Sequence, residues 1–155
     1  MVLTLLVTHQ RFSRARRSDK DFGQVLAMMR PDKKILGLVF DEGDIFRIQP
    51  PYLHFGAWYQ ASKLGESFPS FAYDPPAFQM PVRYRGTPWS MPSVWNPSEF
   101  NWKIHEGWRY DYFLVRSQGP RPALFRDAGP SIELIAQRGA WLLYGRTELR
   151  GRSGN

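Results

Sequence analysis

One unbroken apolar run, Ile35–Phe40, constrains the fold of this 155-residue chain more than any other feature. A strand that faces solvent on one side alternates apolar and polar residues, and this run has no polar position. It therefore predicts a strand at the centre of a sheet, covered on both faces. The polar turn Asp41–Asp44 follows directly, so acidic side chains are expected at the carboxyl end of this strand.

Periodic patterns on either side of this run predict further elements. A helix is expected to start at Ser18–Asp21 and to end near Arg30, because the apolar residues between them recur at helical spacing. Leu53–Leu64 reads as a second helix, preceded by two prolines and followed by a glycine. The expected strands after it are Ser67–Ala72, at an edge because of Pro69, then Pro81–Arg85, Tyr110–Arg116, and a hairpin of Ser131–Gln137 with Ala140–Tyr144.

This order of helices and strands is typical of an α/β fold. We expect a small three-layer sandwich with a central, partly parallel (mixed) sheet and an antiparallel C-terminal hairpin. The long Pro-rich loop Tyr73–Asn101 also carries many aromatic residues, which disordered Pro-rich segments lack, so it is expected to be ordered. Ser117–Pro130 is predicted to be a second loop.

Charge divides the chain into three parts. The net charge is +7, and +4 of it lies in the first 20 residues. We assign residues 1–17 to a basic, partly apolar N-terminal segment, residues 18–147 to a single α/β domain, and residues 148–155 to a polar tail. Met1–Val7 is shorter than the ~20 residues of a membrane span, so it is either the end of a membrane helix or part of an amphipathic helix. The chain has no Cys, which excludes disulfides, thiol nucleophiles and Cys-ligated zinc.

Candidate ligand-binding residues gather around the predicted end of the central strand. Open α/β sheets bind ligands outside the carboxyl ends of their strands. There Asp41 and Asp44 could bind a divalent cation or orient sugar hydroxyls, and His54 could act as a base or a ligand. Trp89 and Trp95, from the long loop, offer flat faces to a sugar ring. The alternatives are a solvated turn, a structural histidine, and rings that only anchor the loop.

Two groups of arginines are candidates for binding anions. Arg83 and Arg85 share one face of a predicted strand and could receive an anion, unless that face is simply solvated. The second group follows the apolar N-terminus and suits an anionic membrane surface: Arg11, Arg14, Arg16 and Arg17. The histidines have no metal-binding spacing, and the chain lacks a phosphate loop and a nucleophile elbow. The sequence therefore points to no metal, no particular cofactor and no reaction.

Several short segments together resemble a known group of proteins. They are Asp21-Phe22 with Val25-Leu26, Ile35–Asp41, Tyr52–Phe55 with Trp58–Ala61, Ser70–Ala72, Pro81–Tyr84, Phe100–Trp102 and Tyr110–Arg116. Over about residues 18–146 the chain resembles the C-terminal soluble region of an uncharacterised group of bacterial multi-pass membrane proteins. These are similar in architecture to glycosyltransferases of the protein-mannosyltransferase type, which use polyprenyl-phosphate sugars. The catalytic acids of such enzymes lie between membrane helices near the start of the chain, so the resemblance carries over no catalytic residue.

The resemblance implies a domain associated with the bacterial inner membrane, on its outer side. The basic run after the apolar N-terminus favours the cytoplasmic side instead, so the side stays open, with a cytoplasmic protein as the alternative. The first hypothesis is a non-catalytic accessory extramembrane domain related to cell-envelope sugar transfer, which positions a sugar, a lipid-linked sugar or a protein partner. The second is a small metal-dependent or acid/base enzyme using Asp41, Asp44 and His54. The third, a nucleic-acid-binding module using the basic segment, is disfavoured because the rest of the chain is nearly charge-balanced.

Overall fold

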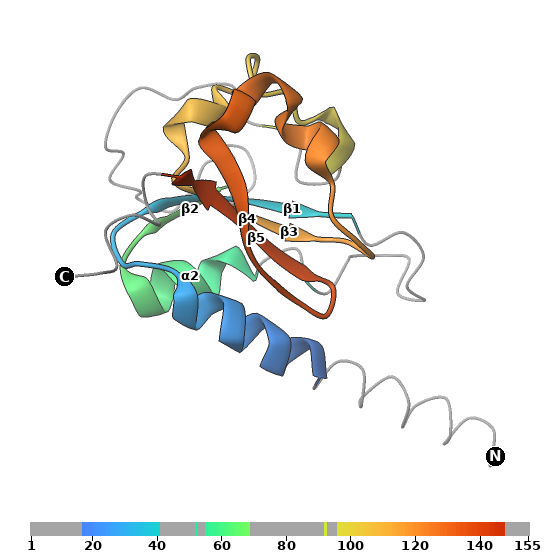
Figure 1. Ribbon diagram of the computed structural model, residues 1–155. Coiled ribbons are helices and arrows are strands. Elements are labelled where there is room, and N and C mark those ends of the chain that lie inside the picture. The colour runs from blue at the N-terminus through green and yellow to red at the C-terminus, as the bar shows by residue number, and fades with distance from the viewer. Residues whose placement is uncertain (1–16, 41–51, 53–54, 69–91, 93–95, 148–155) are drawn as a thin grey trace, which may run out of the picture.

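A five-stranded mixed sheet forms the centre of the molecule in the computed structural model, which describes residues 17–40, 52, 55–68, 92 and 96–147 (Figure 1). The strand order is β2-β1-β3-β5-β4. Three strands are parallel: β1 (Lys34–Val39), β2 (Glu66–Phe68) and β3 (Tyr112–Arg116). β5 (Trp141–Arg146) pairs antiparallel with β3 and with β4 (Ile132–Arg138). The predicted α/β class, mixed sheet and C-terminal hairpin are confirmed.

β1 lies where the apolar run predicts a central strand. It pairs with β2 on one side and with β3 on the other, and the side chains of Leu36 and Leu38 are buried. These two leucines contribute to the core on one face of the sheet, whereas Ile35 contributes to the core on the other. The run has no polar position because both faces of this strand are covered.

Two helices cover one face of the sheet. The first helix is described over residues 17–28, and α2 spans Gly56–Lys63. Figure 1 shows both on the same side of the sheet. Their apolar side chains pack against inward-facing residues of β1, β3 and β5; the buried members of this cluster are Phe22, Val25, Met29, Ile35, Tyr52, Tyr59, Tyr112, Leu114, Ala136, Trp141 and Leu143.

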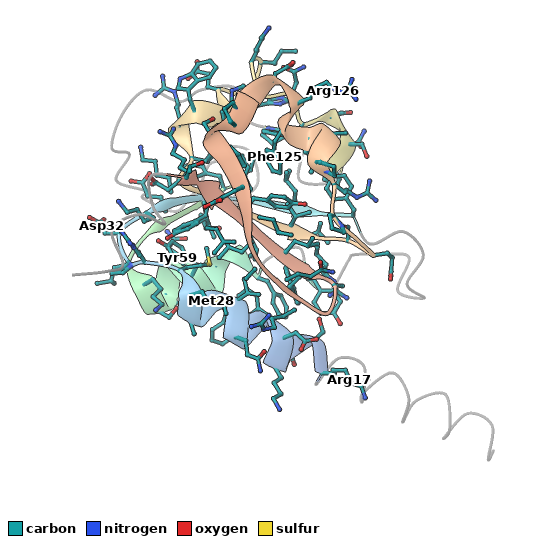
Figure 2. The ribbon with its side chains drawn as sticks, in the orientation of Figure 1. Arg17, Met28, Asp32, Tyr59, Phe125 and Arg126 are labelled. Carbon is teal, nitrogen blue, oxygen red and sulfur yellow. The ribbon has the colours of Figure 1, made fainter. Side chains whose placement is uncertain are left out.

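Three short 3-10 segments cover the opposite face: η2 (Pro97–Glu99), η3 (Gly107–Arg109) and η4 (Pro122–Ser131). Phe125 of η4 packs into the core with its ring centroid 4.9 Å from that of Phe113. Figure 2 shows Phe125 and Tyr59 on opposite sides of the sheet. The expectation of a loop over Ser117–Pro130 holds only in part, because 3-10 turns begin at Pro122 and are interrupted by non-helical backbone at Phe125, whose ring is buried in the core.

Two predicted helix boundaries differ from the structure. Ser18 is not the residue before the first helix, since Arg17 is already helical. The Ser18 hydroxyl instead accepts hydrogen bonds from Arg116 Nη1 at 2.9 Å and Trp141 Nε1 at 3.1 Å. The described part of the second helix begins at Gly56, and Leu64, predicted to lie in it, is an 83% exposed residue with a left-handed backbone.

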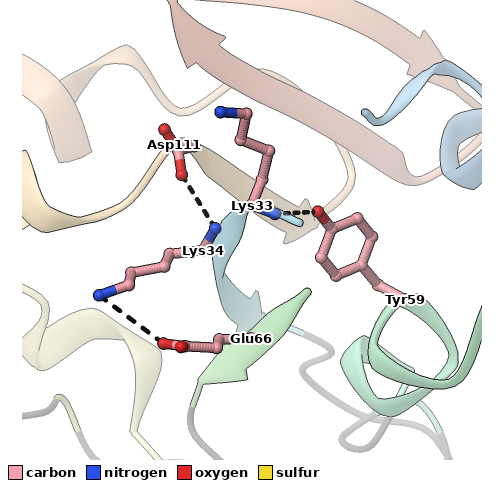
Figure 3. Close-up of polar contacts among 5 residues, drawn as sticks. All are labelled: Lys33, Lys34, Tyr59, Glu66 and Asp111. Carbon is pink, nitrogen blue, oxygen red and sulfur yellow. Dashed lines mark hydrogen bonds and ion pairs between the residues drawn. The ribbon is translucent and has the colours of Figure 1, made fainter. Parts of the chain in front are cut away.

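A polar network fixes the entrance to β1 (Figure 3). The Tyr59 hydroxyl accepts a 2.9 Å hydrogen bond from the Lys33 backbone N–H and donates one of 2.7 Å to the Arg30 carbonyl. One residue on, the Lys34 backbone N–H donates to the Asp111 carboxylate at 2.9 Å. These bonds tie α2, the turn before β1 and the approach to β3 together.

Candidate functional site

Most sequence-predicted site residues lie outside the described residues, and their assembly stays a prediction. They are Asp41, Asp44, His54, Arg83, Arg85, Trp89, Trp95, Arg11, Arg14 and Arg16. Arg17 is the first described residue of the first helix, and its side chain is exposed (Figure 2). Among the described residues, Phe40, which precedes Asp41 in the sequence, directly follows β1.

The carboxyl ends of β1 and β3 form the edge of the sheet best suited to a ligand. The two strands are parallel neighbours, paired from Ile35↔Tyr112 to Val39↔Arg116. After β1 the chain continues to α2 on one face, whereas after β3 it continues to η4 on the other. Connections that diverge from adjacent strands leave a crevice between them, and α/β proteins bind ligands at this point. We call this place the carboxyl edge.

Arg116, the last residue of β3, is the main described side chain at the carboxyl edge. Its guanidinium carbon lies 3.7 Å from the centroid of the Tyr52 ring and 5.2 Å from that of the Trp141 ring. Its Nη1 donates to the Ser18 hydroxyl. The guanidinium thus lies over the ring of a buried tyrosine and is hydrogen-bonded to a hydroxyl group.

A second arginine approaches the carboxyl edge from the opposite face. The Arg121 guanidinium carbon lies 4.1 Å from the centroid of the Phe40 ring. The backbone N–H of Arg121 donates to the Tyr144 hydroxyl at 3.0 Å, which anchors this part of the chain. Phe40 belongs to the core beside η4, whereas Tyr52 belongs to the core beside the helices. Each face of the sheet therefore contributes one guanidinium that lies over an aromatic ring.

An arrangement of this kind can bind an anion. A guanidinium whose face lies on an aromatic ring keeps its N–H donors in the plane, where they fit the two oxygens of a phosphate or carboxylate. Sequence reasoning missed both Arg116 and Arg121 and selected Arg83 and Arg85 for this role. The available signal was an arginine that ends the apolar strand beginning at Tyr112, at the edge where ligands bind.

His105 is part of the packing before η3. Its Nδ1 accepts a 2.9 Å hydrogen bond from the Asn101 backbone N–H, and its ring stacks on that of Phe100 with centroids 5.9 Å apart. Burial lowers the pKa of His105, although the Asn101 bond and the charge of Glu99 oppose this shift. The histidine therefore closes a turn before η3.

The described part of the chain contains neither a metal-binding cluster nor a helix suited to a membrane. No group of three or more His, Cys, Asp or Glu side chains in that part is placed to hold a metal ion. None of its helices has the length and apolarity needed to cross a bilayer. An apolar groove of about 400 Å³ separates the first helix from α2, between Phe22, Leu26 and Trp58.

Comparison of the chain with family models, with curated proteins and with solved structures finds no match.

Proposed function

We propose that this chain is a non-catalytic domain that binds a phosphate-bearing ligand at its carboxyl edge. It would act as an accessory extramembrane domain of a bacterial membrane protein related to cell-envelope sugar transfer, with a sugar phosphate as the bound group. The observation that carries the binding role is the Arg116 guanidinium, fixed 3.7 Å above the Tyr52 ring and hydrogen-bonded to Ser18. The membrane role rests on the sequence of residues 1–17 and on the resemblance described above.

Positioning is favoured over catalysis because the two described side chains with clearly shifted pKa values, Tyr59 and His105, stabilise the fold. Burial is the main reason that the pKa of Tyr59 is raised to about 12, and both polar bonds of its hydroxyl go to backbone groups. His105 likewise uses Nδ1 to hold a turn. A general acid or base has to reach substrate, whereas these two groups are buried and already engaged.

Titration of the full chain with glucose 1-phosphate, followed by NMR, tests the proposal. We expect saturable shifts of resonances at the ends of β1 and β3. Replacing Arg116 with Gln should weaken binding by roughly 10- to 100-fold, since a hydrogen bond to a charged group contributes about 1.5–3 kcal/mol. Arg116→Lys should lose most of the affinity too, because it keeps the charge but not the flat donor array.

Arg126→Gln is the matched control. Arg126 lies exposed on η4 (Figure 2), and its replacement removes the same charge. Binding through the carboxyl edge predicts that this variant keeps its affinity. If Arg126→Gln weakens binding as much as Arg116→Gln, the phosphate responds only to net charge and the proposed site is wrong. Glucose without phosphate is the second control and should leave the carboxyl-edge resonances unchanged.

A further inference from the structure

A second pocket lies at the opposite edge of the sheet, where β3 begins and β5 ends. It has a volume of about 280 Å³ and is lined by Trp102, Trp108, Pro130, Ser131, Arg146 and Thr147. We call it the tryptophan pocket. Its size is at the lower end of ligand pockets, which span about 300–1,000 Å³, so it suits one small ring rather than a large ligand.

The two tryptophans have different roles in the tryptophan pocket. Trp102 is 9% exposed, and its ring centroid lies 5.7 Å from that of Phe113 in the core. The adjacent Gly107 packs against the indole so closely that a Cβ there would overlap it. Trp102 therefore forms a fixed wall. Trp108, in contrast, is 50% exposed, so part of its surface is open to a ligand.

The polar groups of the tryptophan pocket supply both donors and acceptors. Ser131 Oγ donates to the Ala128 carbonyl at 2.6 Å, and Thr147 Oγ1 donates to the Pro130 carbonyl at 3.0 Å. Because each hydroxyl donates its proton to a carbonyl within the protein, its oxygen can accept a hydrogen bond from a ligand. Arg146 brings N–H donors, and its Nε is anchored on the Tyr110 carbonyl at 3.2 Å.

We propose that the tryptophan pocket binds one monosaccharide ring. A pyranose has an apolar face of C–H groups, which suits the open indole of Trp108, and a rim of hydroxyls that both donate and accept hydrogen bonds. The hydroxyls would donate to Ser131 and Thr147 and accept from Arg146. A purely apolar ligand would cover the acceptor lone pairs of Ser131 and Thr147 without donating to them, which disfavours it.

This site is independent of the one proposed at the carboxyl edge. Arg116 is the last residue of β3, whereas the tryptophan pocket adjoins the residues before Tyr112, the first. A neutral sugar can therefore bind here whether or not a phosphate binds there. The two proposals fail separately, because one is tested with Arg116 and a phosphate, and the other with Trp108 and a neutral sugar.

Saturation-transfer NMR on the full chain tests the tryptophan pocket, with the methyl glycosides of glucose, mannose and galactose as probes. We expect saturation to pass from the protein to at least one glycoside. The same glycoside should shift one indole N–H resonance of the protein. That resonance belongs to Trp108 if it is absent from the spectrum of Trp108→Ala. The dissociation constant of the glycoside should be on the order of millimolar. Trp108→Ala should weaken binding about tenfold or more. Thr147→Val, which removes one exposed hydroxyl, should weaken it by a smaller factor.

Trp58→Ala is the matched control, since Trp58 is another exposed tryptophan (62%) but lies on α2. This variant should bind the glycoside as well as the wild type does. The proposal is overturned if none of the three glycosides receives saturation. It is also overturned if Trp58→Ala weakens binding as much as Trp108→Ala, or if neither Trp108→Ala nor Thr147→Val reduces it.

Discussion

The turn before β1 depends on the hydroxyl group of Tyr59, and Tyr59→Phe removes this group. Tyr59 is 0% exposed, so water does not replace the hydroxyl without a structural change. The variant loses the bond from the Lys33 N–H and the bond to the Arg30 carbonyl. Buried polar groups that lose a partner cost about 1–3 kcal/mol each, so the expected loss for the two groups is about 2–6 kcal/mol. Domains of this kind have total stabilities of about 5–15 kcal/mol.

Urea denaturation at pH 7, followed by circular dichroism, measures this loss. The midpoint should fall with little change in slope, because the surface exposed on unfolding stays the same. Tyr112→Phe is the matched control. Tyr112 is buried in the same core, and its hydroxyl accepts a longer bond of 3.4 Å from the Arg30 N–H. It should cost less than about 1 kcal/mol. Equal losses in the two variants would refute the argument that the two short bonds of Tyr59 carry the effect.

The same residue gives a dependence on alkaline pH. Burial raises the pKa of Tyr59 from 10.0 to about 12 in the folded protein. Between these values the unfolded chain releases the tyrosine proton first, so stability is full below pH 10 and falls as the pH rises toward 12. Tyr59→Phe should lose this part of the alkaline dependence, and Tyr112→Phe should retain it. A wild type and a Tyr59→Phe variant with the same alkaline slope would show that the hydroxyl is not held protonated by burial.

Three further predictions concern the core, a histidine and the N-terminal segment. Leu38→Asp buries a carboxylate in the central strand and should cost at least several kcal/mol of thermal stability, whereas Leu134→Asp, at a 38% exposed position on edge strand β4, should cost far less. Because the folded protein has the lower His105 pKa, stability should fall as the pH drops below 6.5, and His105→Asn should flatten this part of the urea-midpoint curve. Replacing the four arginines of residues 11–17 with Gln should abolish salt-sensitive flotation with anionic liposomes, since each contributes about 1 kcal/mol at such a surface; equal flotation of both proteins would contradict the membrane role.

Elements with a local signal could be predicted from the sequence. β1 was predictable because burial on both faces requires an apolar residue at every position of the strand. The C-terminal hairpin was predictable because Gly139 marks its turn, and the structure places that glycine in a left-handed conformation with φ 54°. In both cases the physical cause acts within a few residues, so the residues themselves carry the information.

Elements that depend on distant partners could not be predicted in this way. The Ser18 hydroxyl looked like a helix cap, but its partners are Arg116 and Trp141, 98 and 123 residues away. η4 contains Pro130, and its backbone is non-helical at Phe125 and Gly129. It is held by the insertion of Phe125 into the core of the sheet, which is a tertiary contact. The arginines of the carboxyl edge were missed for the same reason, since only the pairing of β1 with β3 brings Arg116 beside the end of β1.

The parallel pairing of β1 and β3 also determines how the two proposed sites relate to each other. Arg116 and the tryptophan pocket lie at opposite ends of β3, whose five residues span about 17 Å at about 3.3 Å per residue. Substitutions farther apart than about 7–10 Å that share no partner have additive effects on free energy. The double variant Arg116→Gln with Trp108→Ala should therefore bind glucose 1-phosphate at the carboxyl edge as weakly as Arg116→Gln alone, and the glycoside as weakly as Trp108→Ala alone. If the double variant binds either ligand more weakly than the corresponding single variant does, β3 transmits strain between its ends. The two sites are then one coupled unit rather than two separate ones.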